Sequence, residues 1–134
     1  MTVDELISRS TSNPKMLFLI DGLGALLSAF LLGVVLVRFE SLFGMPREAL
    51  YILAALPCFF AVYDLFCYWR VTRGWSPYLK GIAIINLLYC CISIGFVIHH
   101  FPSLTYLGLL YFVGELIIVL SLAYIEYKAA NQLA

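Results

Sequence analysis

The chain of 134 residues is 63% hydrophobic and only 12% charged, which is far more apolar than the roughly half-apolar composition of soluble domains. A soluble domain of this length has too little interior to bury so many apolar side chains, so that class is excluded. Eight basic residues balance eight acidic ones, so the chain lacks the basic field that favours nucleic acid as a partner. Membrane lipid is the expected partner instead.

Four apolar segments are long enough to span a membrane, since about 20 apolar residues cross about 30 Å of hydrocarbon. In chain order they are Met16 to Val37, Ala49 to Trp69, Gly81 to Ile98, and Leu104 to Ile125. The connections between them are short and contain Gly and Pro, so consecutive helices should run antiparallel. The sequence therefore predicts an all-α integral membrane protein, an up-down antiparallel bundle of four transmembrane helices that forms a single domain over residues 1–134.

The basic residues predict which side of the membrane each end faces, because cytoplasmic segments carry an excess of Lys and Arg. Six basic residues lie in the N-terminal segment 1–15, in the connection between the second and third spans, and after the fourth span. The connection between the first two spans holds only two, Arg38 and Arg47. We expect both termini, and with them residues 1–15, to be cytoplasmic, and the protein to be a multi-pass protein of a bacterial inner membrane.

Carboxyl groups inside the predicted spans mark the candidate site. An ionisable group at a helix centre costs about 2.5–3.5 kcal/mol on insertion scales, so each one calls for an explanation. Asp21, Asp64 and Asn86 lie at similar depths in three spans, while Glu115 lies nearer the middle of the fourth. At about 100° per residue, each shares a helix face with small residues or tyrosines, which indicates a polar interior. The predicted ligand-binding residues are Asp64, Glu115, Asn86, Asp21, Tyr63, Tyr89 and Tyr111.

A structural interpretation of the same residues stays open. Asn86 and the tyrosines would then satisfy protonated carboxyl groups and hold the helices in register, without binding anything else. Asp21 has a further alternative, since a carboxyl one turn inside a span can reach interfacial water or cap a helix start.

Short catalytic and cofactor motifs are missing from the sequence. It has no phosphate-binding glycine loop, zinc-protease motif, nucleophile elbow or Cys-x-x-Cys pair, and its two histidines are adjacent. We therefore predict no metal, no cofactor and no catalytic residue. Enzymatic activity is not expected, although membrane enzymes acting on lipids can work with two carboxyl groups that leave no linear signature.

Three functions remain compatible with this pattern. The first is a small membrane protein whose polar cavity in the inner half of the bundle binds or transports a proton, a cation or a small ligand. The second is a structural or assembly subunit of a larger membrane complex. The third is a membrane enzyme acting on a lipid or isoprenoid substrate, with Asp64 and Glu115 as acid and base.

A ridge of small residues on the first span bears on oligomeric state. Gly22, Ala25, Ala29 and Gly33 recur at intervals of three and four residues, which permits close helix approach. Packing within the chain explains the ridge more economically than a homodimer does, but a homodimer remains an alternative, particularly for a transporter of this size.

Overall fold

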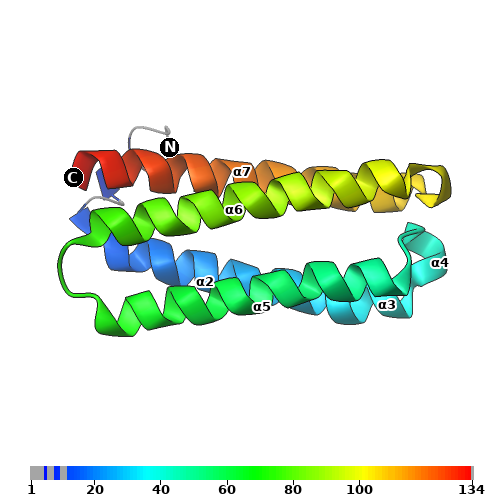
Figure 1. Cartoon of the computed structure of the whole chain (residues 1–134), viewed down its shortest axis with the longest axis horizontal. Coiled ribbons are helices and arrows are strands. Elements are labelled where there is room, and N and C mark those ends of the chain that lie inside the picture. The colour runs from blue at the N-terminus through cyan, green and yellow to red at the C-terminus, as the bar shows by residue number, and fades with distance from the viewer. Residues whose placement is uncertain (1–4, 6–7, 10–11, 134) are drawn as a thin grey trace.

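The computed structural model describes residues 5, 8–9 and 12–133, and this part of the chain is helical without strands. Four helical segments, Pro14–Arg38, Arg47–Arg70, Trp75–His99 and Tyr106–Leu133, are long and apolar enough to cross a membrane. The first comprises α2 (Pro14–Phe30), a π-helical stretch η1 (Leu31–Val35) and α3 (Leu36–Arg38), and the others are α5 (Arg47–Arg70), α6 (Trp75–His99) and α7 (Tyr106–Leu133). Figure 1 shows these segments lying along a common axis, with the start of α2 and the end of α7 at the same end of the molecule.

The helices extend past most ends of the predicted spans. The exception is α7, which begins at Tyr106 because Leu104 is extended and the hydroxyl of Thr105 accepts a hydrogen bond from the Gly108 N–H at 3.0 Å. At its other end α7 continues well past Ile125 to Leu133. The predicted N-terminal segment 1–15 lies only partly within the described residues.

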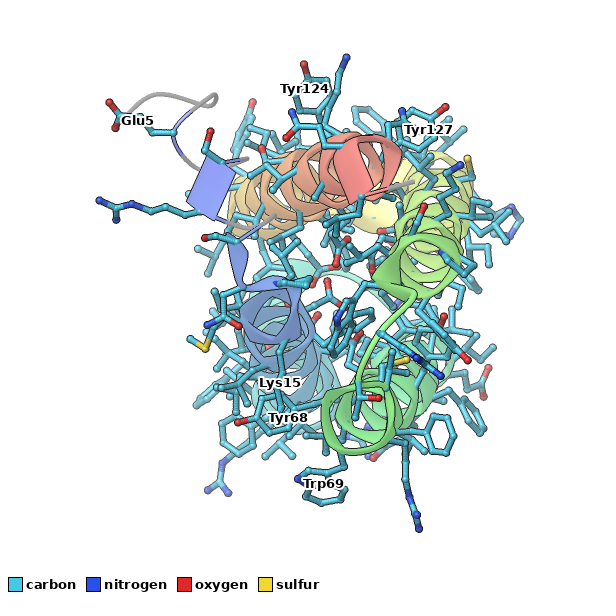
Figure 2. All side chains as sticks on the ribbon, turned by 90° about the vertical axis from the view of Figure 1, so that its left-hand side faces the viewer. Glu5, Lys15, Tyr68, Trp69, Tyr124 and Tyr127 are labelled. Carbon is cyan, nitrogen blue, oxygen red and sulfur yellow. The ribbon has the colours of Figure 1, made fainter. Side chains whose placement is uncertain are left out.

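The helices form two closely packed pairs, α2 with α5 and α6 with α7. The pairs touch each other less, and α2 and α7 make fewer contacts than α5 and α6 do. Figure 2 looks along the helices and shows them at the corners of a rectangle. A Cβ atom added at Gly22 would lie 3.2 Å from the Cβ of Asp64, and one at Gly33 would lie 3.2 Å from the Cβ of Ala54. These two glycines of the small-residue ridge therefore pack against α5 of the same chain.

At the end away from the termini, the short helix α4 (Glu40–Phe43) joins the two pairs. Gly44 ends α4 in the left-handed conformation, with φ of 83°, which favours glycine. The Thr105 N–H donates to the Phe43 carbonyl at 3.2 Å, and the Ser103 hydroxyl donates to the Gly44 carbonyl at 2.8 Å. Backbone groups of the first helix pair thus bind directly to the connection between α6 and α7.

At the end that carries the termini, side chains make the connection. Within the second pair, the Ser76 hydroxyl at the start of α6 donates to the Ala130 carbonyl of α7 at 2.8 Å. The rings of Phe18 on α2 and Trp75 on α6 lie 5.6 Å apart between centroids, so they link the two pairs. Both ends are fixed in this way, whereas the middle of the molecule is less tightly closed.

The outward faces of the helices are apolar. Phe59, Val62 and Leu110 are 71%, 68% and 70% exposed, and most other exposed positions in the middle of the helices are also Leu, Ile, Val or Phe. A soluble monomer rarely exposes so continuous an apolar surface. The polar side chains of the spans instead gather inside, between the two helix pairs.

Candidate ligand cavity and buried carboxyl cluster

A cavity of about 390 Å³ lies between the two helix pairs. Most of its wall comes from α2 and α7, while α5 and α6 close the back with Pro57 and Phe60, and with Asn86 and Tyr89. The volume falls within the roughly 300–1,000 Å³ typical of small-molecule sites. Its lining is mainly apolar, and its polar groups include Asp21, Ser28 and Glu115.

The mouth of the cavity opens between α2 and α7. The most exposed lining residues belong to these two helices, Leu27 on α2 being 59% exposed and Leu110 on α7 being 70% exposed. Two glycines, Gly24 and Gly114, line the cavity from opposite helices, and a Cβ atom at either would meet nothing within 4 Å. The sparse contact between α2 and α7 is therefore an accessible opening and not a seam filled by side chains.

Glu115 carries the main polar contact of the cavity. The Ser28 hydroxyl of α2 donates to its Oε2 at 2.9 Å, the Tyr111 hydroxyl one turn earlier on α7 donates to the same oxygen at 2.7 Å, and the Tyr89 hydroxyl of α6 donates to Oε1. A carboxylate has about four lone-pair positions, so three donors leave room for one more. The site can therefore accept a further hydrogen bond from a ligand.

No basic side chain balances this carboxyl group. Residues 16–37, 49–69, 81–98 and 104–125 contain no Lys, Arg or His. A buried ion without a counter-ion costs several kcal/mol, so the cavity favours a proton, a cation or a hydrogen-bond donor and disfavours an anion. This preference follows from the absence of basic residues in these four ranges and from the buried position of Glu115.

A second polar group, the carboxyl cluster of Asp21, Asp64 and Glu126, lies next to the cavity. The Asn86 side-chain amide donates to Asp21 Oδ1 at 3.0 Å and to Glu126 Oε1 at 2.8 Å. These two bonds use both hydrogens of the amide. All three carboxyl groups are buried, Asp64 and Glu126 completely so.

Asp64 is the least satisfied member of the carboxyl cluster. Among the described residues, neither Oδ1 nor Oδ2 of Asp64 has a hydrogen-bond partner, and neither does Oε2 of Glu126. The nearby carboxyl groups of Asp21 and Glu126 act on Asp64 as like charges. Ionised carboxylates repel one another, so a proton on one or more of the three groups would relieve this repulsion.

Two departures from regular α-helix border the cavity. Pro57 in α5 has no N–H to donate, which leaves the carbonyl of Leu53 without its usual partner. The π-helical stretch η1 begins at Leu31, which lines the cavity. Stretches of this kind occur frequently at functional sites.

The structure divides the predicted site residues between these two groups. Glu115, Tyr89 and Tyr111 are hydrogen-bonded together at the cavity, and Asp21, Asp64 and Asn86 meet in and around the carboxyl cluster, with Asp21 and Asn86 also lining the cavity. Tyr63 does not line the cavity, and its hydroxyl donates to the Tyr78 carbonyl at 3.0 Å.

Sequence reasoning left Ser28 and Glu126 out of the predicted site. Glu126 lay one residue beyond the predicted fourth span, although it follows Glu115 by 11 residues, which is close to three full helical turns. Ser28 follows Asp21 by seven residues, close to two turns, so it lies on the same face of α2. Helical periodicity was thus the available signal for both.

The chain matches no protein-family model, and comparisons with curated proteins and with solved structures found no significant match. Within the described residues, no group of three or more His, Cys, Asp or Glu side chains is arranged to hold a metal ion. The cavity and the carboxyl cluster are therefore interpreted from their own geometry.

Proposed function

We propose that the protein is an integral membrane protein that binds a small amphiphilic ligand with a cationic or hydrogen-bond-donating end. The cavity at Glu115 carries this proposal, because it combines an apolar wall, a carboxyl group held by hydroxyl groups, and a mouth between two apolar helices. The ligand's apolar part would lie along α2 and α7, and its polar end would bond to Glu115.

Insertion as an up-down bundle with both termini in the cytoplasm is part of the proposal. The apolar outer faces support insertion, and the excess of basic residues at the end with the termini supports the orientation. At that end Trp69, Tyr124 and Tyr127 are exposed and point outward from the helices, as Figure 2 shows. Aromatic residues in such positions are typical of a membrane–water interface.

A bilayer surrounding these helices would meet the mouth of the cavity directly. A ligand already dissolved in lipid would then reach Glu115 by moving sideways between α2 and α7, without passing through water. This route favours a molecule that partitions into membranes over a fully hydrated one. Transport of the ligand by a homodimer is an extension of this proposal, for which the cavity supplies the binding step.

The test is a matched series of ligands that differ only in the polar end. The protein is reconstituted in lipid nanodiscs and mixed with decylamine, decanol or decanoic acid, and bound ligand is measured by native mass spectrometry. We expect decylamine to be retained best and decanoic acid least. Glu115→Gln should weaken decylamine retention by at least about tenfold, since a hydrogen bond to a charged group contributes about 1.5–3 kcal/mol.

The control is Glu48→Gln, which removes an exposed carboxyl group at the first turn of α5, away from the cavity. Its decylamine retention should equal that of the unmodified protein. Equal retention of all three ligands, or no effect of Glu115→Gln in a folded protein, would contradict the proposal. A stoichiometric partner subunit in place of ligand would favour the role of assembly subunit.

A further inference from the structure

We propose that Asp21, Asp64 and Glu126 form a proton-binding site, separate from the ligand position at Glu115, whose protons exchange through the cavity. This inference does not depend on the proposed ligand. It rests on the Asn86 amide that Asp21 and Glu126 share, on the burial of all three carboxyl groups, on the oxygens of Asp64 and Glu126 that have no donor among the described residues, and on the position of Asp21 in the cavity wall.

Without added protons, the carboxyl cluster has too few hydrogen-bond donors for its carboxyl oxygens. Asn86 supplies one hydrogen to Asp21 and one to Glu126, and it has no other to give. Both oxygens of Asp64 and Oε2 of Glu126 then remain without a donor among the described residues. Protons on these carboxyl groups would supply the missing hydrogen-bond donors and remove the repulsion between like charges.

The surroundings of Asp64 offer no other source of positive charge. The groups that face it are Asp21 from α2, Glu126 from α7, and Cys67 and Tyr63 from its own helix. None of these is a cation, and residues 16–37, 49–69, 81–98 and 104–125 contain no Lys, Arg or His. Asp64 is fully buried, and neither of its oxygens has a hydrogen-bond partner among the described residues. A proton is consequently the partner available to it.

Access distinguishes an exchangeable site from a fixed structural hydrogen bond. Asp21 takes part in the cluster and also lines the cavity, whereas Asp64 and Glu126 do not line it. Protons entering or leaving the cluster would therefore pass through Asp21. Asn86, which lines the cavity as well, positions the carboxyl groups of Asp21 and Glu126 on either side of its amide.

The experiment is infrared spectroscopy of the full chain in lipid at pH 7, where exposed carboxyl groups, with reference pKa values of about 4, are ionised. We expect the carbonyl stretching band of a protonated carboxylic acid in the unmodified protein. The band should shift in D₂O without unfolding, because the protons exchange through the cavity. Asp64→Asn and Glu126→Gln, which resemble the neutral acids in shape, should each remove part of the band, and Glu48→Gln should leave it unchanged.

Three results would overturn the proposal. The first is the absence of the band at pH 7 in the unmodified protein, a result that needs no variant to fold. The second is a band that persists unchanged in both Asp64→Asn and Glu126→Gln. The third is a band that does not shift in D₂O over hours in the folded protein, which would make the protons fixed structural ones. A missing band together with a melting temperature that rises with added Na⁺ would assign the cluster to a metal cation instead.

Discussion

Among single Gly-to-Ala substitutions at helical glycines, Gly108→Ala is expected to destabilise the protein most. A Cβ atom at Gly108 would lie 2.0 Å from the carbonyl oxygen of Phe43, a backbone atom that cannot move without shifting α4. Overpacking of this kind costs about 1–3 kcal/mol and occasionally more, and we expect a value at or above the top of that range. The measurement is the thermal unfolding midpoint in a mild detergent.

The same measurement on two other glycines separates crowding from a general effect of the substitution. Gly44→Ala should also be strongly destabilising, because its Cβ would lie 2.1 Å from the Ser103 carbonyl oxygen and its φ of 83° strains a residue with a side chain. Gly95→Ala is the control, since its Cβ meets nothing within 4 Å. Similar midpoints for Gly108→Ala and Gly95→Ala would show that α4 does not pack on α7 as described.

This contact also explains why the end away from the termini holds the two helix pairs together. The loss of the Gly108 contact would separate α4 from the start of α7 and weaken the hydrogen bond from the Thr105 N–H to Phe43. Distortion here should spread toward the cavity, because Tyr111 lies one turn beyond Gly108 on α7. The variant is therefore expected to lose ligand retention together with stability.

The sequence was informative about helices because apolar length is a strong signal. Four apolar runs of about the thickness of a bilayer indicated four long helices, and the part of the chain that the structure describes has four helices of that kind. Their ends were harder to predict, since polar residues such as Glu126 and Lys128 continue α7 beyond its apolar part. Hydropathy reports the solvent that surrounds a helix, and the helix itself can extend farther.

Depth and helical face together indicated part of the candidate site. Asp21, Asp64 and Asn86 were expected at one level, and the structure brings them together, whereas Glu115 belongs to a different level with Tyr89. Tyr63 has a similar depth to its neighbour Asp64, but an adjacent residue points about 100° away, and its hydroxyl binds the Tyr78 carbonyl near the start of α6 instead. Depth alone therefore did not decide which residues meet.

The sequence predicted a polar cavity, but it gave no signal for the size of the cavity or for its mainly apolar lining. An empty volume depends on how far apart two helix pairs lie, and this distance is set by contacts at their ends, such as those of Phe18 with Trp75 and of Thr105 with Phe43. Glycines such as Gly24 and Gly114 are compatible with close packing or with open space, and the pattern of small residues does not distinguish the two. Only the three-dimensional arrangement shows that these two glycines face a void.

Filling the cavity should abolish ligand binding while leaving the fold intact. In Gly114→Leu the new side chain would begin in open space beside Glu115, and in Gly24→Leu it would begin in open space on the opposite helix. Neither Cβ atom meets a neighbour within 4 Å, and leucine favours the helix by up to about 1 kcal/mol over glycine, so the unfolding midpoint should stay the same or rise. Retention of decylamine in nanodiscs should fall by at least about tenfold, which corresponds to about 1.4 kcal/mol.

Gly95→Leu is the matched control for this loss. Its Cβ also meets open space, but Gly95 lies on α6 beside Ile92 and His99 and does not line the cavity. The same leucine on an outer surface should therefore leave decylamine retention unchanged. If all three leucine variants retain the amine equally, the ligand lies outside the cavity and Glu115 acts from elsewhere. If only Gly24→Leu and Gly114→Leu lose it, the space between α2 and α7 is the binding site, and the stability of these variants excludes unfolding as the cause.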